Sequence, residues 1–392
     1  MISKRFIISI LSIFIFPFSA TSAFAAIITI SPSQSIQTVV NTANSGDTIQ
    51  VRAGTYPSFT ISKNNLIIAG YPGERPILSG GSGIVLSGSG IIFSNFEVTS
   101  MSANQSAAIL SRGSDNIIKD NLVHGNISQG TNGIIVMGTN NRVENNTLHN
   151  NNRMGIGIYN SSGNIITNNT VYNNKLSAGD SDGIHCIGDS AGQSHDNIIR
   201  DNITYENADD GIDTWNCTSN QIIGNISHHN GGTGDGHGIK LGYGGNNIVK
   251  NNTSYSNLAC GFTSNGSGNS YENNIAYSNA QCGFTDSYRV PGNTGTSSFI
   301  NNVAYNNPTN YVKGQYTTVF TGNSESAPSP PPSTIPIKPG DANGDNKVDG
   351  IDYIVWLNHY SQSVSGATNG DFNNSGIVDG VDYVVWLNNY GK

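Results

Sequence analysis

Between about residue 107 and residue 310 the chain alternates very short apolar pieces with Asn and Gly. The apolar pieces, such as Ile117-Ile118 and Ile198-Ile199, are too short for helices and rich in strand-forming residues. They follow the pattern Asn-x-[Ile/Val]-x-x-Asn-x4-Asn, with small variations, and the copies start 25, 23, 33, 23, 27, 22 and 28 residues apart. A period near two dozen residues indicates a solenoid. We therefore predict an all-β right-handed parallel β-helix, whose copies start at Asn116, Asn141, Asn164, Asn197, Asn220, Asn247, Asn269 and Ser297.

The Asn and Gly residues of the repeat are suited to the corners of such coils. Both tolerate the left-handed backbone that a corner requires, and stacked Asn side chains form hydrogen-bonded ladders. The longer intervals between copies are interpreted as loops, notably 175–193 and 231–236.

The beginning of the chain predicts export and an end cap for the solenoid. Residues 1–25 have a basic start, an apolar run over 6–18 and Ala23-Phe24-Ala25 before Ala26, which is typical of a cleaved secretory signal peptide. No other segment has the length and apolarity to span a membrane. Residues 35–43 have apolar positions at helical spacing, and we expect them to form a short helix that covers the first coil. The protein is expected to be secreted.

The end of the chain contains a linker and a second, smaller domain. Pro residues concentrate in the segment 324–339, which predicts a stiff, extended linker. It separates a β-helix domain at 26–323 from a module at 340–392. The module carries two copies of one pattern, 30 residues apart, starting at Asp341 and Asp371.

Each copy has the spacing of a calcium loop. Oxygen ligands fall at loop positions 1, 3, 5, 9 and 12, a backbone carbonyl is available at position 7, and an apolar segment of helical length follows. The sequence therefore predicts two calcium ions, held by Asp341, Asn343, Asp345, Lys347 (carbonyl), Asp349 and Asp352, and by Asp371, Asn373, Ser375, Ile377 (carbonyl), Asp379 and Asp382.

This tandem pattern resembles type I dockerin modules. The resemblance implies small α-helical, EF-hand-like folding around calcium and docking onto a cohesin-type scaffold protein. Dockerins often carry Ser or Thr at loop positions 10 and 11, where the partner is chosen. This chain has Gly350-Ile351 and Gly380-Val381 there, so a different surface partner is the alternative.

Composition and charge narrow the class of partner. Charged residues make up 11% of the chain and the net charge is −8. No basic stripe exists, which excludes nucleic acid as the expected partner. The four cysteines are Cys186, Cys217, Cys260 and Cys282. The last two occupy equivalent positions of adjacent coils, about 4.8 Å apart at Cα, so either a disulfide or two stacked thiols is expected.

A second short repeat carries the charged residues. The phrase x-Gly-[Ile/Phe]-y occurs in seven coils, and three consecutive copies contain Asp182, then Asp209, Asp210 and Asp213, then Lys240. Aligning the glycines places Asp182 and Asp210 in one column, and His185, Asp213 and Lys240 in another. The four carboxylates are thereby brought within roughly 5–8 Å across neighbouring coils.

Four like charges this close require a counter-charge, which Lys240 alone does not supply. A divalent cation offsets several carboxylates at once, and ligands that are all oxygen favour calcium. The alternative is a structural calcium that only holds two coils together.

Lys240 suggests acid–base chemistry beside that cation. A dication should lower the pKa of the amine from about 10.4, whereas Asp213 should raise it, so the cation must dominate for the amine to act as a base. A cation that holds a carboxylate beside an amine base fits proton abstraction α to that carboxylate. In a uronic acid polymer this step leads to β-elimination. The alternative is a plain salt bridge between Lys240 and Asp213.

At these residues the chain resembles polysaccharide lyase family 9. The segments 206–215, 236–242 and 181–184 carry the resemblance, which is specific over about 150–290. It implies a calcium-dependent pectate lyase with a parallel β-helix, in which Asp182, Asp209, Asp210 and Asp213 bind one calcium ion and Lys240 is the base. Family members have a basic residue soon after the first calcium ligand, where this chain has His185-Cys186. Side chains proposed to contact other parts of a polygalacturonate or pectin chain are Arg153, Lys175, His237 and Arg289.

The sequence leaves three other functional interpretations open. A glycoside hydrolase on this scaffold would use two or three of the carboxylates, but would leave Lys240 without a role. A uronan epimerase would share the proton abstraction and need a second acid, for which His237 or Tyr243 is available. A non-catalytic adhesin would use the calcium only for structure.

Overall fold

The computed structural model describes residues 25–102, 106–175, 181–286, 296–313, 318–327, 338–343, 347–364, 366–373 and 375–391. The predicted signal peptide, apart from Ala25, and most of the predicted linker lie outside these residues. The chain divides into two compact units, Met1–Ser326 and Ala327–Lys392. Each unit is described by itself.

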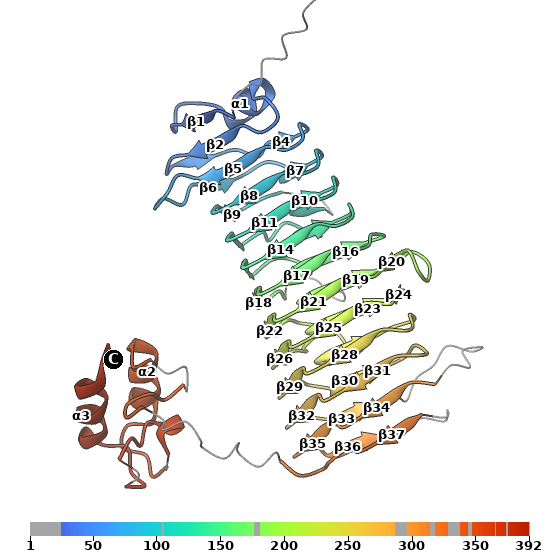
Figure 1. Cartoon of the computed structure of the whole chain (residues 1–392), viewed down its shortest axis with the longest axis vertical. Helices are drawn as coiled ribbons and strands as arrows, with labels where there is room; N and C mark the ends of the chain where they lie inside the picture. Colours follow the sequence, from blue (N-terminus) through green and yellow to red (C-terminus); the bar gives the residue numbers. More distant parts are fainter. Residues whose placement is uncertain are drawn as a thin grey trace, which may run out of the picture. The chain divides into compact units, whose positions relative to one another are not determined.

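The first unit is a β-solenoid of three parallel sheets, to which each coil contributes one short strand (Figure 1). This confirms the predicted fold class. Sheet A consists, in spatial order, of β1 (Ile27–Ile30), β2 (Thr48–Val51), β5 (Ile67–Gly70), β8 (Ile92–Ser94), β11 (Ile117–Lys119), β14 (Arg142–Glu144), β17 (Ile165–Thr167), β21 (Ile198–Arg200), β25 (Gln221–Ile223), β28 (Ile248–Lys250), β31 (Ser270–Glu272), β34 (Ser298–Ile300) and β37 (Val319–Thr321).

Sheets B and C complete the coil. Sheet B consists of β3 (Thr55–Tyr56), β6 (Ile77–Ser79), β9 (Glu97–Thr99), β12 (Leu122–His124), β15 (Thr147–His149), β18 (Thr170–Tyr172), β22 (Ile203–Tyr205), β26 (Ile226–His228), β29 (Thr253–Tyr255), β32 (Ile275–Tyr277) and β35 (Val303–Tyr305). Sheet C consists of β4 (Thr60–Ile61), β7 (Ile84–Leu86), β10 (Ala107–Ser111), β13 (Asn132–Val136), β16 (Ile156–Tyr159), β19 (Ile184–Ile187), β23 (Ile212–Trp215), β27 (Ile239–Leu241), β30 (Cys260–Ser264), β33 (Cys282–Thr285) and β36 (Thr309–Val312). A small extra pair is β20 (Ser194–His195) with β24 (Cys217–Thr218).

The core is a column of apolar side chains inside the coils. In most strands of sheets A and B the middle residue points inward, as Ile118, Val123 and Ile199 do, and is fully buried. Strand side chains alternate between the two faces of a sheet, so the flanking residues face outward. This alternation explains why the sequence shows only one or two apolar residues per piece.

Three ladders of buried Asn join the coils at their corners. In each ladder the side-chain oxygen of one Asn accepts the backbone N–H, and in most cases also the side-chain N–H, of the Asn one coil before. Asn225, for example, accepts the backbone N–H of Asn202 at 3.0 Å and donates its side-chain N–H to Asn252 at 2.9 Å and to the carbonyl of Ile199 at 2.9 Å. The predicted ladders are therefore present.

The left-handed backbone falls one residue earlier than the repeat suggested. The residue before the ladder Asn, not the ladder Asn itself, has positive φ, as at Asn145 (57°), Asp201 (55°) and Asn251 (56°). Asn and Asp adopt this conformation at low steric cost. The corner thus uses two adjacent polar residues, one for the turn and one for the ladder.

The helix α1 (Ile36–Thr42) caps the first coils as predicted. It begins at Ser35, whose side-chain oxygen accepts the backbone N–H of Thr38. Its buried residues, Ile36 and Val40, belong to the solenoid core. The cap shields an end that would otherwise expose apolar side chains.

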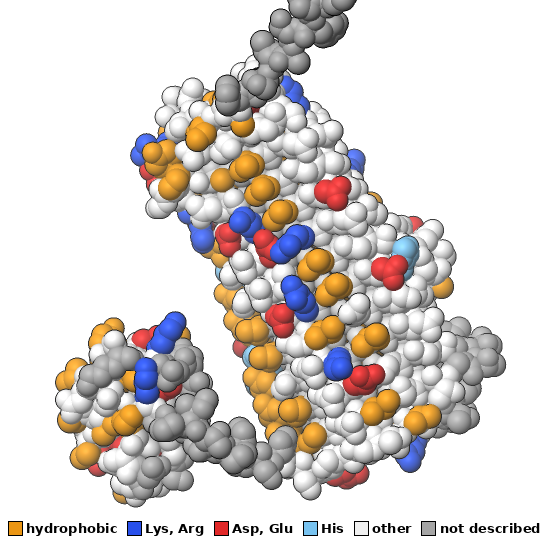
Figure 2. Space-filling view, viewed as in Figure 1, with side chains coloured by type: hydrophobic (Ala, Val, Ile, Leu, Met, Phe, Trp, Pro, Cys, Tyr) orange, Lys and Arg blue, Asp and Glu red, His pale blue; other side chains and the backbone are white. Residues whose placement is uncertain are grey.

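The outer face of sheet B carries a stack of aromatic rings. Successive ring centroids lie 4.7–5.1 Å apart and the planes are within 17° of parallel. Hydrophobic side chains follow this edge of the solenoid in Figure 2. The stack contains His124, His149, Tyr172, Tyr205, His228, Tyr255, Tyr277 and Tyr305.

All four cysteines form disulfides. Cys260 and Cys282 pair across adjacent strands with Cα atoms 4.4 Å apart, which decides between the two states left open by the sequence. Cys186 and Cys217 also pair, with Cα atoms 6.4 Å apart. This second bridge was not predicted, because the cysteines occupy different positions of their coils.

Two segment boundaries differ from the predictions. The interval 175–193, interpreted as a loop, contains β19, because its Ile184 and Cys186 point into the core. The solenoid also continues into the predicted linker, since Ser324 donates its backbone N–H to the carbonyl of Asn302.

The second unit contains two α-helices, α2 (Gly350–His359) and α3 (Gly380–Asn389), and the short 3₁₀ helix η1 (Ala367–Asn369). Both α-helices begin with the same capping box, formed by an Asp at the N-cap and an Asp three residues later. The indole of Trp356 donates to the carbonyl of Asp379, and that of Trp386 donates to the carbonyl of Asp349, both at 2.9 Å. The two sequence copies are thus related by reciprocal contacts.

None of the helices in the described part of the chain has the length and apolarity that a membrane span requires.

The ladders lead to a stability prediction. Replacing Asn225 by Ala should lower the free energy of unfolding by about 1–3 kcal/mol, because it leaves buried N–H groups of Asn202 without an acceptor. Gln221→Ala, which changes an exposed residue of the preceding strand, is the control and should shift stability by less than about 0.5 kcal/mol. Urea unfolding followed by circular dichroism measures both; equal midpoints would contradict a stabilising role for the ladder.

Candidate metal and acid–base site

The predicted carboxylates meet where two successive coils enter sheet C. Asp182 precedes β19, Asp209 and Asp210 precede β23, and Asp213 lies within β23. Carboxylate oxygens of Asp182, Asp209 and Asp210 lie within 4.8 Å of one another. The side chain of Asp182 also accepts the backbone N–H of Asp210 at 3.0 Å. The two columns predicted by aligning the glycines are therefore real.

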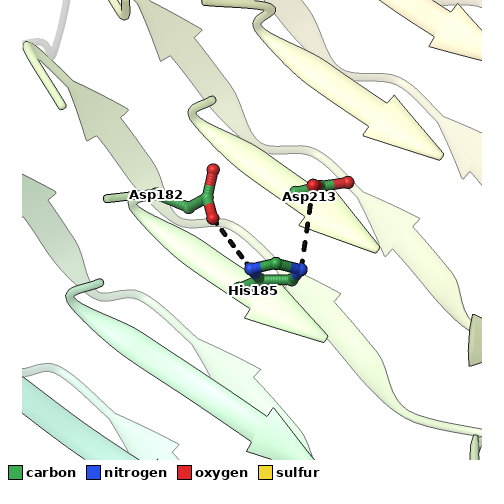
Figure 3. A group of neighbouring side chains, drawn as sticks. All are labelled: Asp182, His185 and Asp213. Carbon is green, nitrogen blue, oxygen red and sulfur yellow. Dashed lines mark ion pairs between the residues drawn. The ribbon is translucent and has the colours of Figure 1, made fainter. Parts of the chain in front are cut away.

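His185 lies between two of these carboxylates (Figure 3). Its Nδ1 is 2.8 Å from Oδ2 of Asp182 and its Nε2 is 3.7 Å from Oδ2 of Asp213. Ligand atoms of Asp182, His185 and Asp213 also lie within 4.8 Å of one another. The sequence placed His185 in the column of Asp213 and Lys240, but gave it no role in the site.

Burial disfavours the charged forms of the carboxyl groups of Asp182, Asp209 and Asp210. Asp182 and Asp210 are almost fully buried and Asp213 is 4% exposed. Burial raises the pKa of Asp182 to about 6, although His185 opposes the rise. Burial likewise raises the pKa of Asp209, and raises that of Asp210 well above its usual range despite the nearby Lys240.

Lys240 is held by three carboxylates. Its Nζ lies 3.0 Å from Asp210, 3.3 Å from Asp213 and 2.9 Å from Asp235. Burial alone would lower the pKa of the amine, but the three carboxylates outweigh burial and raise it. The salt bridge with Asp213 is thus present, and without a cation the amine is held in its charged form.

Asp235 is a member of the site that the sequence did not reveal. It lies in the segment 231–236, which interrupts the repeat, and its backbone N–H donates to Asp209 at 2.7 Å. The hydrogen bond from Lys240 lowers the pKa of its carboxyl. Because the column argument applies only to residues within the repeat, it could not place a loop residue here.

His237 is fixed beside Lys240 in one tautomer. Its backbone N–H donates to Asp210 at 2.6 Å. Its Nδ1 accepts the backbone N–H of Cys260 at 3.2 Å and lies 2.8 Å from the hydroxyl of Thr263. Because a backbone N–H can only donate, the ring proton is on Nε2. Burial lowers the pKa of His237 to about 4, so the ring is neutral at neutral pH.

Two hollows flank Lys240 on the outer face of sheet C. One, of about 290 Å³, is lined by His185, Ile187, Asp209, Asp213, Trp215 and Lys240. The other, of about 490 Å³, lies toward the later coils and includes Trp215, His237, Lys240, Tyr243, Thr263 and Thr285. A ligand lying across the strands can reach both hollows past Lys240.

The donor set fits a divalent cation. Oδ1 of Asp213 is buried and has no hydrogen-bond partner in the described part of the chain. The four carboxylates supply oxygen ligands, which calcium prefers, and Lys240 does not compensate for all of their charge. A cation bound by Asp182, Asp209, Asp210 and Asp213 would stabilise the charged carboxylates and so oppose the burial and repulsion that raise the pKa values of Asp182, Asp209 and Asp210.

Other predicted site residues fall elsewhere. Arg153 lines a separate hollow near β16, and Lys175 is exposed and lines none of the hollows around Lys240. Arg289 lies outside the described residues.

The predicted ligands of the C-terminal unit are partly engaged with the backbone. Asp352 and Asp382 are fully buried, and Asp352 accepts backbone N–H groups of Ala342 and Asp349. Asp371 accepts the backbone N–H of Ser375 at 2.9 Å. The described acidic residues of this unit form no cluster of three, and Asp345 lies outside the described residues.

Comparison with known proteins supports the fold of the first unit. The chain is similar to the crystal structure of pectate lyase Pel9A, with 20% identity, 79% of this chain and 82% of that chain covered, and a TM-score of 0.56. It is also similar to the A-module of the mannuronan C-5 epimerase AlgE6 from Azotobacter vinelandii, with 14% identity, 75% and 95% covered, and a TM-score of 0.51. At these identities the likenesses show the fold alone. No curated protein matches the chain.

A family model described as "Pel9A-like, right handed beta helix region" matches residues 19–323. The match covers the three coils that carry the carboxylates and Lys240, and it confirms the predicted hand of the helix. Because it spans well over half of the sequence, the chain belongs to the Pel9A-like right-handed β-helix family.

Proposed function

We propose that the protein is a calcium-dependent lyase that cleaves polygalacturonate or pectin by β-elimination, with Lys240 as the base. The observation that carries the proposal is the contact of one buried lysine with three carboxylates, beside further buried carboxylates, between two hollows of the outer face. Membership of the Pel9A-like family and the likeness to a pectate lyase support it.

The residues divide the chemistry between them. A calcium ion held by Asp182, Asp209, Asp210 and Asp213 would bind the substrate carboxylate and stabilise the charge that develops on it. Nζ of neutral Lys240 takes the proton from C5 of the uronate. The electrons of that C–H bond form the C4–C5 double bond, the bond from C4 to the glycosidic oxygen breaks, and the leaving oxygen takes up a proton.

The electrostatics of Lys240 tie its basicity to the cation. With bare carboxylates around it the pKa of the amine is raised, so the base form is scarce at neutral pH. Offsetting these negative charges removes the cause of the rise and lowers the pKa. Acid–base function and metal binding are therefore coupled through Asp210 and Asp213.

Lys240→Ala should lower the rate of cleavage by at least about 10²-fold, because the proton acceptor is lost. Lys250→Ala, which removes a lysine from sheet A that pairs with Glu272, is the matched control. Formation of unsaturated uronide from polygalacturonate, followed by ultraviolet absorbance, measures both. The wild-type rate should rise with pH as the amine loses its proton, and this rise should move to lower pH as calcium increases. Full activity of Lys240→Ala would rule out the assigned base.

Uronan epimerisation is the second candidate, favoured by the placement of His237. The neutral Nε2–H of His237 and Nζ of Lys240 line the same hollow, so a donor and an acceptor are both available. The likeness to the epimerase module is compatible with this reading. The same assay run in D₂O with NMR detection separates the two, since an epimerase inverts C5 and incorporates deuterium without forming the double bond.

Calcium binding should show three sites in the whole chain, one in the solenoid and two in the C-terminal unit. Asp210→Asn should leave two sites and Asp371→Ala should also leave two, as measured by isothermal titration calorimetry. Binding to the solenoid site should weaken below about pH 6, because Asp182, with its raised pKa, must then lose a proton to bind. An unchanged stoichiometry in Asp210→Asn would contradict the assignment.

For the C-terminal unit we propose docking onto a cohesin-type protein. Its two helices expose matching apolar rows, with Ile351 and Leu357 on α2 and Val381 and Leu387 on α3 each 51–56% exposed. Binding of an immobilised cohesin in the presence of calcium should be lost in the double variant Leu357→Asp/Leu387→Asp. If the wild type binds no cohesin, the proposed docking function is wrong.

A further inference from the structure

From β7 to β36, the outer face of sheet C presents one residue of each strand in a single column. The strand register links these residues in unbroken order across ten coils. The column is apolar in the early coils, charged in the middle and mostly hydroxyl-bearing beyond Lys240. Its members are Val85, Leu110, Ile135, Gly157, His185, Asp213, Lys240, Thr263, Thr285 and Val312.

A second row lies two residues further along each strand, on the same outer face. Tyr159, Ile187 and Trp215 pair in register, and the backbone pairing continues past the ends of β10 and β13 to Arg112 and Met137. Trp215 is 38% exposed and Met137 is 45% exposed. The row therefore runs from the wall of the Lys240 hollow to an arginine, over five successive strands.

A third hollow, of about 430 Å³, lies on this row. Its lining includes Leu110, Arg112, Ile135, Met137, Arg153 and Tyr159. The floor depends on Gly157, because a Cβ there would lie 2.5 Å from Ile135 and 2.9 Å from the ring of Tyr159. The hollow meets the site at Tyr159, whose register partner Ile187 lines the 290 Å³ hollow beside Lys240.

The chemistry of this surface fits a chain of acidic sugars. Pyranose rings present C–H faces that pack on apolar and aromatic side chains, and guanidinium groups bind carboxylates through paired hydrogen bonds. Arg112 and Arg153 place two cations beside an apolar floor in a protein of net charge −8. Four steps between neighbouring strands span about 19 Å, room for several sugars lying across the coils.

We propose that Arg112, Met137, Tyr159, Ile187 and Trp215, with Arg153 beside them, form a distal binding surface for consecutive uronate residues of the polysaccharide. The ligand class rests on the proposed function. The polymer lies along the solenoid axis, and the surface holds the part of it on the N-terminal side of Lys240. Continuity with the Lys240 hollow and complementarity of charge identify this occupant.

Charge reversal at Arg112 tests the surface. Arg112→Glu should weaken binding to polygalacturonate by about tenfold or more, because a charged hydrogen bond becomes a repulsion. Arg200→Glu reverses the charge of another exposed arginine, on sheet A, and should bind as the parent does. Binding is measured by retardation in gels that contain polygalacturonate and calcium, with every variant built on Lys240→Ala to prevent cleavage. Met137→Asp, at an exposed position, should weaken binding in the same direction.

The outcomes separate this proposal from the proposed lyase. If Arg112→Glu and Met137→Asp lose retardation and Arg200→Glu keeps it, the distal surface is supported. This holds whether or not the protein with Lys240 intact cleaves the polymer. Equal retardation of all variants overturns the surface and leaves lyase activity standing. In protein that keeps Lys240, Arg112→Glu should raise KM for the polymer more than KM for short oligomers that cannot reach Arg112. Equal effects on both KM values would also overturn the proposed surface.

Discussion

The fixed register between neighbouring coils is the constraint on which the rest of the structure depends. Each coil is held to the next by backbone pairing in three sheets and by buried Asn side chains at the corners. A residue at one position of the repeat therefore lies one inter-strand spacing, about 4.8 Å, from its equivalents before and after it. This spacing brings Asp213 and Lys240 together although 27 residues separate them in the chain.

The same register forces like charges into contact. Asp182 and Asp210 share one column, and nothing in the repeat lets them move apart. Their burial raises the pKa of both carboxyls, so the site without a cation is electrostatically unfavourable. The stack of His and Tyr rings on sheet B is favourable at the same spacing, because 4.7–4.8 Å between centroids suits ring contact. The scaffold thus stabilises repeated apolar or aromatic residues and destabilises repeated charges.

Sequence periodicity predicted what the register controls and missed what lies outside it. The solenoid, the Asn ladders, the gathering of the four Asp and the contact of Lys240 with Asp213 follow from aligned repeats, and the capping helix follows from the helical spacing of apolar residues in 35–43. Asp235 was missed because it lies in an insertion, whose path depends on hydrogen bonds such as the one to Asp209. The bridge between Cys186 and Cys217 was missed for a related reason. Its partners occupy different positions of the coil, and only the three-dimensional path of β19 and β24 brings them together.

The placement of the site on sheet C follows from how the three outer faces differ. Sheet B repeats stacked rings, and the part of sheet A visible in Figure 2 mixes isolated charges with rows of hydrophobic side chains. The outer column of sheet C instead changes from apolar to charged to hydroxyl-bearing residues along the solenoid, and its charged part contains three consecutive members, His185, Asp213 and Lys240. Such a gradient would offer different environments to successive units of the proposed polysaccharide, and Lys240 lies between the apolar and the hydroxyl-bearing parts of the column. The proposed chemistry is therefore located where the sequence departs from the repeat, while the coils on either side keep the geometry fixed.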